Sequence, residues 1–568
     1  MASVPSARVQ PSRLRAAAGA FVTNWRNPEL RRAQAAFFGA WTAEWAVTVV
    51  LAVYAYGRGG ATEVGVVALV RVLPAAIVAP LATQFADRWP REKVLVAVSL
   101  VRSVTIALAG WAVFVDGPAL AVYALVTVSS AAAVLFRPVH SALLPSLCAT
   151  PPELAGANVV RGALDSAATL AGPLISAVLL ATGGPAQVLA VAAIASAWAG
   201  WLMARVHPEP TPLDDADDSE GALARALGGV RAVNAHPDLR LLFGLIGLQT
   251  FMRGAVTVFM VVVSVELVKL GDPGVGLLNA ALGAGAVLAS AAAALLVGTK
   301  RLAAWFGLGA ILWGAPLVVI GLVPSVASAM VMLAIVGAGN ALIDVGGFTL
   351  IGRIAPPAAL ARVFGLLESV VAIAVGLGAL LTPVVIDALD LRTALVVLGL
   401  LTPVAIALSW RRLRALDAVI VGRDDELSLL RGVPLLDALP LPALETVARE
   451  LDHVLVPAGA DVFRQGDPGD RFYVVVAGTA QVVGDGRPVA SLGPGDSFGE
   501  IALLRRVPRT ATVSAVDELR LESLRGDRFL ALMTGSPRGQ AATSAHVDEM
   551  LDRFAPRPGA DEQPPPAG

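Results

Sequence analysis

Twelve apolar segments, each long enough to cross a membrane, constrain this chain more than any other feature of its sequence. A helix needs about 20 consecutive apolar residues to span the hydrocarbon core of a bilayer. Only 15% of the residues are charged, whereas an average soluble domain carries about 25%. We therefore expect a lipid bilayer to cover much of the chain. The predicted spans are residues 33–56, 61–84, 94–116, 118–145, 157–182, 185–205, 239–268, 274–298, 301–322, 325–351, 363–386 and 392–410.

The spans form two groups of six, residues 33–205 and 239–410, separated by a polar cytoplasmic loop at 206–238. The loop contains an acidic run and then an amphipathic pattern from Ala222 to Val233, which predicts a helix on the membrane surface. The segments before the fifth and eleventh spans, PPELAGANVVRGALDS and PPAALARVFGLLES, are alike. This similarity indicates two related halves, and parallel repeats of this kind are typical of secondary transporters.

The distribution of Lys and Arg between the loops predicts the orientation of the chain. The inner segments hold sixteen of these residues, whereas the outer loops hold only Arg58, Lys269 and Arg392. We therefore expect a multi-pass protein of the plasma (inner) membrane with both termini in the cytoplasm. Residues 1–32 have no long apolar run, which predicts a cytoplasmic tail rather than a cleaved leader. The single cysteine, Cys148, excludes an intrachain disulfide.

The composition becomes that of a soluble domain after a linker at residues 411–433. In the predicted domain, residues 434–555, glycines recur at the spacing of turns between short strands such as RFYVVVAG and AQVV. Helical patterns at 441–451 and 526–553 flank the strands. The last residues, 556–568, are rich in proline and are predicted to be disordered.

The segment FGEIALLRRVPRTATV, Phe498–Val513, carries the chemistry of the soluble domain. Its glycine-rich turn leads into a one-turn helix, and the free N–H groups at a helix N-terminus attract anions. Arg509 adds a planar fork of donors that suits a phosphate. Glu500 can accept a hydrogen bond from a hydroxyl group. The pattern predicts a site for a small, nucleotide-sized polar ligand.

This segment resembles the phosphate-binding cassette of cyclic-nucleotide-binding domains, and FRQGDPGDRFYVVVAGTAQV resembles their strands. The resemblance implies an α+β domain, a β jelly-roll with flanking helices, whose regulatory ligand is cAMP or cGMP, with no covalent cofactor. It implies that Glu500 holds the ribose 2′-hydroxyl and Arg509 the cyclic phosphate. The alternative is a barrel that has kept its shape and lost its ligand. The remaining implied site residues are Gly499, Ile501, Ala502 and Thr510.

The segment QFADRWPREKV, between the second and third spans, resembles motif A of the major facilitator superfamily. Asp87, Arg88 and Arg91 match the pattern, whose two glycines are replaced here. The resemblance implies an all-α fold of twelve helices and an inner gate in which Asp87 faces the start of the eleventh helix, Arg362–Gly365. The alternative is a loop that only obeys the positive-inside bias. The fifth span resembles that of drug-exporter-like members, which implies export of small molecules.

Ionisable residues inside a span are costly and tend to face a cavity. Glu44 and Arg253 lie nearest the middle of the first and seventh spans, which line the cavity in this superfamily. Arg161 and Asp165 are one helical turn apart, so a structural ion pair between them is an alternative. The predicted transport and coupling residues are Glu44, Arg253, Asp165, Glu368 and Asp344.

These patterns together predict a secondary active transporter, coupled to protons and controlled by a cyclic nucleotide. One alternative is a membrane receptor for cyclic nucleotide that no longer transports. A second is a gated channel, but the chain lacks a TVGYG filter. No P-loop, GxSxG or metal-ligand pattern predicts an enzyme or a metal site. The net charge of −1 argues neither for nor against nucleic acid, and we expect no such partner.

Overall fold

The computed structural model describes the chain in two compact units, Met1–Leu416 and Asp417–Gly568. Side chains at 73–88, 151–152, 155, 222–227, 291–296, 345, 361, 418–429, 532 and 534 are outside its description, as are residues 1–25 of the predicted N-terminal tail, the predicted C-terminal tail and the acidic run of the central loop. The described residues are 26–148, 150–208, 222–296, 301–356, 359–433, 436, 444, 447–448 and 450–534.

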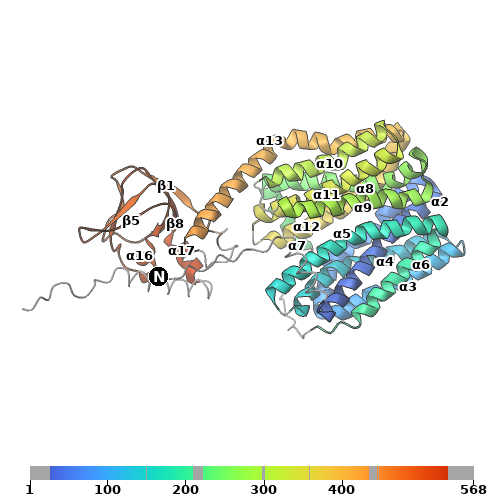
Figure 1. Ribbon diagram of the computed structural model, residues 1–568, viewed down its shortest axis with the longest axis horizontal. Coiled ribbons are helices and arrows are strands. Elements are labelled where there is room, and N and C mark those ends of the chain that lie inside the picture. Colours follow the sequence, from blue (N-terminus) through green and yellow to red (C-terminus); the bar gives the residue numbers. More distant parts are fainter. Residues whose placement is uncertain are drawn as a thin grey trace, which may run out of the picture. The chain divides into compact units, whose positions relative to one another are not determined.

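The first unit is built from helices (Figure 1). A 3₁₀ turn follows α4, and a π-helical turn follows α8. The helices are α2 (Pro28–Arg88), α3 (Arg91–Phe114), α4 (Ala119–Leu143), α5 (Pro151–Thr182), α6 (Pro185–Met203), α7 (Ala222–Ala235), α8 (Pro237–Val262), α9 (Gly271–Leu296), α10 (Leu302–Leu322), α11 (Val326–Ile354), α12 (Leu360–Leu389) and α13 (Leu391–Gly432).

The predicted first and second spans are the two arms of the single element α2. Asn27 caps its start, because its side chain accepts hydrogen bonds from the backbone N–H groups of Glu29 and Leu30 at 3.1 and 3.2 Å. The backbone is non-helical at Gly59 and Gly60, which divides the element into the arms 33–56 and 61–84.

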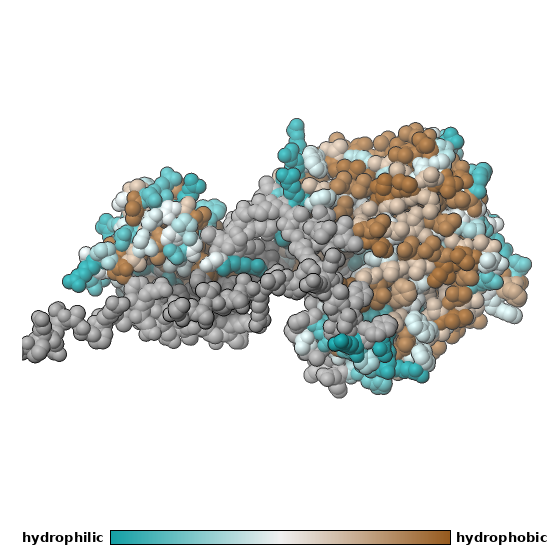
Figure 2. All heavy atoms as spheres, in the orientation of Figure 1, coloured by the Kyte–Doolittle hydropathy of each residue, from teal (hydrophilic) through white to brown (hydrophobic). Residues whose placement is uncertain are grey.

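Eleven segments among the described residues are long and apolar enough to cross a membrane, the longest being the Pro28–Val72 part of α2. Large apolar side chains cover much of the visible surface of this unit (Figure 2). Phe114, Leu120 and Leu408 are 71%, 78% and 82% exposed. Such a surface requires an apolar solvent, so the unit is a multi-pass membrane domain.

The helices of the two halves meet mainly along two pairs, α5 with α9 and α2 with α12, and α2 also contacts α8 and α9. At Gly276 of α9, a Cβ atom would lie 2.7 Å from the carbonyl oxygen of Pro173 in α5. The absence of a side chain at Gly276 therefore lets the two backbones touch. Small residues serve the same purpose at many helix interfaces in membranes.

Two segments outside the predicted spans are also helical. The amphipathic pattern from Ala222 to Val233 forms α7, as predicted, and α7 packs against α8 and α12. The predicted linker 411–433 is helical as far as Gly432, because α13 continues through it. The stretch RRLRALDAVIV contains no glycine or proline, and the helix continues past Gly422 to end at Gly432.

The second unit contains two four-stranded antiparallel sheets, with strand orders β1-β8-β3-β6 and β2-β7-β4-β5. Of the predicted flanking helices, α17 (Gly526–Thr534) is described, whereas residues 535–553 are outside the description. The short helix α16 (Glu500–Arg505) lies between β6 and β7. The strands are β1 (Asp452–Val456), β2 (Asp461–Phe463), β3 (Arg471–Ala477), β4 (Ala480–Gly484), β5 (Arg487–Leu492), β6 (Ser497–Phe498), β7 (Thr512–Ala515) and β8 (Leu519–Arg525).

Alternate side chains of β3 enter two different cores. Phe472 and Val474 belong to a cluster with Phe529 of α17, where the Phe472 and Phe529 rings stack at 4.6 Å. Tyr473 and Val475 belong to a second cluster with residues of both sheets. The strand is therefore buried on both faces, which explains its nearly continuous apolar run.

Candidate functional sites

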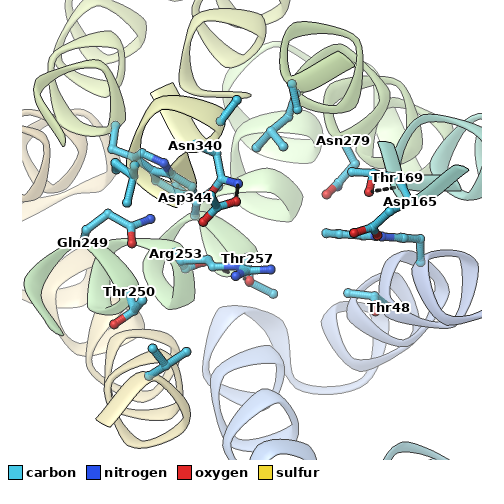
Figure 3. Close-up of a pocket in the computed structure, with 18 of the residues that line it drawn as sticks. Thr48, Asp165, Thr169, Gln249, Thr250, Arg253, Thr257, Asn279, Asn340 and Asp344 are labelled. Carbon is cyan, nitrogen blue, oxygen red and sulfur yellow. Dashed lines mark hydrogen bonds between the residues drawn. The ribbon is translucent and has the colours of Figure 1, made fainter. Parts of the chain in front are cut away.

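A cavity of about 500 Å³ lies between the two halves of the membrane unit. Its lining comes from α2, α4 and α5 of the first half and from α8 to α12 of the second. Figure 3 shows two polar groups facing it, with Thr48, Asp165 and Thr169 apart from Arg253 and Asp344. A cavity lined by both halves is where alternating-access transporters hold their substrates.

The first half places an ion pair at the cavity, between Arg137 of α4 and Asp165 of α5. The Arg137 guanidinium also lies over the Trp41 ring, 4.9 Å from its centroid. The predicted alternative, a pair between Arg161 and Asp165, is wrong, because Asp165 pairs with the neighbouring helix instead.

The second half contributes Arg253, Asp344 and Glu368, one from each of three helices. Asn340 lies one turn before Asp344 on α11, and its Nδ2 donates to Asp344 Oδ2 at 2.8 Å. All three charged residues are exposed to solvent although they lie within spanning helices. This exposure is consistent with a water-accessible cavity.

Glu44, the remaining predicted coupling residue, is not part of the cavity lining. Its carboxylate forms ion pairs with Arg71, in the second arm of α2, and with Arg102 of α3, the latter at 2.7 Å. Arg71 also donates to Ser130 Oγ at 2.7 Å. The Arg102 side chain is only 1% exposed. The carboxylate therefore compensates one buried and one partly buried cation and joins three segments of the first half.

The second unit contains a pocket of about 400 Å³, formed by β2, β4 to β7 and α16. Gly499 stands between β6 and α16 with a φ of 95°, in the left-handed region that favours glycine. This turn places Glu500 and Ile501 at the pocket, opposite Arg509 and Thr510 of the segment before β7. Gly499 and Ala502 complete the set, so all six residues predicted for this site line one pocket.

Arg509 is held in place by the backbone around the pocket. Its guanidinium donates to the carbonyl oxygens of Gly499 at 3.0 Å and Arg471 at 2.8 Å, and it lies 3.3 Å from a carboxylate oxygen of Asp470. The Phe463 ring lies under it, with 4.1 Å between the guanidinium carbon and the ring centroid. The side chain is 2% exposed. A cation fixed at a pocket wall is suited to an anionic ligand.

Glu500 is almost completely buried, with 2% of the residue exposed. Burial raises the pKa of its carboxyl to about 7, although Arg509 acts in the opposite direction. The charge of Glu500 therefore changes near neutral pH.

Comparison with protein families identifies both units. The model described as Major Facilitator Superfamily matches residues 35–323. The chain belongs to the major facilitator superfamily. A second model, described as cyclic nucleotide-binding domain, matches residues 453–536. This facilitator chain thus carries a cyclic nucleotide-binding domain at its C-terminal side, as the sequence predicts.

Relatives of the facilitator's second unit come from proteins of other kinds. A cAMP-dependent protein kinase regulatory subunit of Emericella nidulans is 37% identical over 128 residues, which are 22% of this chain and 31% of that protein. A cyclic nucleotide-gated potassium channel of Rhizobium etli is 42% identical over 109 residues, 19% and 30% of the two chains. The facilitator chain thus spans about a third of the length of these curated relatives.

Solved structures match the same part of the facilitator chain. The regulatory domain of Toxoplasma gondii PKA, crystallised with cAMP, is 33% identical, covers 23% of this chain and 50% of that one, and has a TM-score of 0.20. The Thermus thermophilus catabolite activator protein is 31% identical, covers 21% and 58% of the two chains, and also has a TM-score of 0.20.

The predicted inner gate of the facilitator unit is described only in part. Arg91 donates to the carbonyl oxygen of Ala142 at 2.7 Å, which ties the loop after α2 to the end of α4. The side chains of Asp87 and Arg88 lie outside the described residues. The sequence did not reveal that α7 packs at the predicted partner segment, where Gly229 lies against the backbone of Arg362.

The sequence also did not reveal the cluster of aromatic rings against which Arg509 packs. Phe463, Tyr473 and Phe498 come from three strands, and their ring centroids lie 5.2–5.9 Å apart. The only sign of these rings in the sequence is their position: Phe498 begins the cassette, and Phe463 and Tyr473 lie in the strand-like segment before it. Their contact depends on the pairing of those strands, which a single sequence does not specify.

Proposed function

We propose that this chain is a secondary active transporter of small molecules, an exporter, whose transport cycle is controlled by cAMP or cGMP. The cavity between the two halves carries the proposal, because it places Asp165 from one half and Asp344 from the other at one water-accessible site. Alternating access around such a site needs only a relative movement of the halves.

Protons are the proposed coupling ion, and Asp165 and Glu368 are the proposed carriers. Both line the cavity, and Asp165 is paired with Arg137. Protonation of Asp165 would release Arg137, so proton binding and the arrangement of the cavity would be linked. We propose a structural role for Glu44, because two arginines already engage its carboxylate. Asp87, Arg88 and Arg91 remain the proposed inner gate.

The second unit is the proposed regulatory site, with Arg509 on the cyclic phosphate and Glu500 on the ribose 2′-hydroxyl. The relatives named as a cAMP-dependent kinase subunit and a cyclic nucleotide-gated channel support this class of ligand. The nucleotide can shift the transport equilibrium only by its difference in affinity for the two states. Both termini are proposed to lie in the cytoplasm, at the plasma membrane.

Flux in everted and right-side-out vesicles tests the function and the orientation together. We expect a proton gradient to drive dye or amino-acid flux in everted vesicles, and added cAMP or cGMP to change that flux by changing the affinity for the transported molecule, by about 5- to 150-fold, the usual range of coupling between two sites. Right-side-out vesicles should not respond to added nucleotide, because the site is inside. A response only in right-side-out vesicles would reverse the proposed orientation. Nucleotide binding without any flux would favour the receptor alternative.

The affinity for nucleotide should depend on pH through Glu500. Because burial raises the pKa of its carboxyl to about 7, the charged acceptor is the minor form at pH 6 and the major form at pH 8. If the 2′-hydroxyl binds the carboxylate, the affinity for cAMP should rise by about tenfold over this interval. Calorimetry with cAMP at both pH values measures the change. 2′-Deoxy-cAMP and the variant Glu500→Gln are the controls, and both should respond weakly; an equal response in either would contradict the assignment.

A further inference from the structure

Arg253 is a cation inside a spanning helix that forms no ion pair with any of the described residues. Its side chain is exposed to the cavity, and its guanidinium makes no hydrogen bond or ion pair with any of them. Arg137, the other arginine of the cavity, is paired with Asp165. A charge at this depth is costly unless it is compensated. Arg253 is therefore the cavity's available site for an anionic group.

Asp344 provides an available anion on the neighbouring wall. Asn340 holds one of its carboxylate oxygens at 2.8 Å, and no described cation forms an ion pair with it. Figure 3 shows Asp344 and Arg253 on the same side of the cavity, with their charged ends directed toward the cavity. Arg253 and Asp344 interact electrostatically without a direct ion pair. A ligand with two opposite charges could contact both.

Aromatic side chains form part of the cavity walls. Trp41, Trp45, Trp313 and Phe348 line the cavity. Trp313 is only 2% exposed, and its buried indole N–H has no hydrogen-bond partner among the described residues. Aromatic walls favour a ligand that also carries an apolar or aromatic group.

We propose that the substrate is a zwitterion of the amino-acid class, with its carboxylate on Arg253, its ammonium on Asp344 and its apolar side chain against the tryptophans. This inference rests on the proposed transport function and specifies its substrate. It assigns Arg253 and Asp344 to substrate binding, and leaves proton coupling to Asp165 and Glu368.

Three related probes test the two charge contacts separately on the purified full-length chain. They are phenylalanine, its methyl ester, which keeps only the cation, and N-acetylphenylalanine, which keeps only the anion. Binding is followed by quenching of tryptophan fluorescence. Hydrogen bonds to charged groups imply a loss of about tenfold to a hundredfold for each charge removed. Equal binding of all three probes would overturn the proposal.

Two substitutions should change the order of affinity for the three probes rather than abolish binding altogether. In Arg253→Gln the advantage of phenylalanine over its methyl ester should disappear, whereas its advantage over N-acetylphenylalanine should remain. Asp344→Asn should have the opposite effect, and Arg253→Lys should restore part of the preference for the carboxylate. Arg392→Gln and Asp116→Asn, at exposed residues outside the cavity, are matched controls. An unchanged order in both cavity variants would refute the assignment.

Counterflow in proteoliposomes separates this inference from the proposed function. Radiolabelled phenylalanine should exchange, and the monocation tetraphenylphosphonium and the monoanion benzoate should not. Exchange of a singly charged probe without phenylalanine would keep the transporter and reject the zwitterion. If no probe is exchanged or bound while everted vesicles still show proton-driven dye flux, only the substrate assignment fails; if that flux is also absent, the proposed transport function fails with it.

Discussion

Arg509→Ala should weaken the binding of cAMP or cGMP by about a hundredfold or more. The substitution removes a buried cation from the pocket wall, where Gly499 and Arg471 hold the guanidinium by their carbonyl oxygens. Hydrogen bonds to charged groups contribute about 1.5–3 kcal/mol, and a forked contact to phosphate lies at the upper end. At 1.4 kcal/mol per decade, the loss is two decades. Calorimetry on the full-length protein measures it.

Controls distinguish loss of the ligand contact from loss of the fold. Arg509→Lys should recover only part of the affinity, because an ammonium cannot reproduce the fork. Arg520→Ala removes an arginine of the same unit that is 67% exposed and should bind normally. The thermal unfolding of the ligand-free variants shows whether the pocket remains folded. A wild-type protein that binds neither nucleotide at millimolar concentration would be the barrel that has lost its ligand.

Glu44→Gln should destabilise the membrane unit by about 3–5 kcal/mol, the usual cost of removing one partner from a buried ion pair. Arg102 is 1% exposed, and both it and Arg71 depend on this carboxylate for compensation. Their positive charges would then repel each other within the first half of the unit. Thermal unfolding in detergent measures the loss.

A second substitution makes this prediction specific to charge. Glu44→Gln combined with Arg71→Gln removes one positive charge as well, and should recover part of the lost stability. Asp116→Asn, at a side chain that is 95% exposed, is the control and should unfold like the wild type. The sequence-based expectation for Glu44 is the opposite outcome: a stable variant that has lost only its pH-dependent flux.

The sequence predicted those features that depend on local patterns. Apolar length is sufficient to find the spans, and the short loop with Arg91 is recognisable from its residues. The cassette from Gly499 to Thr510 is also contiguous, because one turn and one short helix bring its residues to a single pocket. Family models match both units that these patterns indicated.

Features that depend on contacts between distant segments could not be predicted in this way. Glu44 was expected in the cavity because it lies near the middle of its span, but depth in the membrane does not specify which face of the helix it occupies. Its partner Arg102 is 58 residues away along the chain. Asp165 likewise pairs across helices with Arg137, rather than with the arginine one turn away. Only the packing of the helices decides between such partners.

The backbone contact between α9 and α5 at Gly276 has a consequence for the strength of regulation. Lipid tails are as apolar as the helices, so no hydrophobic driving force holds these surfaces together, and each atomic contact contributes only about 0.1–0.2 kcal/mol. Separating α9 from α5 therefore costs the sum of many small contact energies, and no single bond dominates that sum. If a cyclic nucleotide controls transport as proposed, the few kcal/mol that it can supply are comparable with these small terms, so we expect it to change the rate of turnover rather than to start it, with basal turnover persisting in its absence.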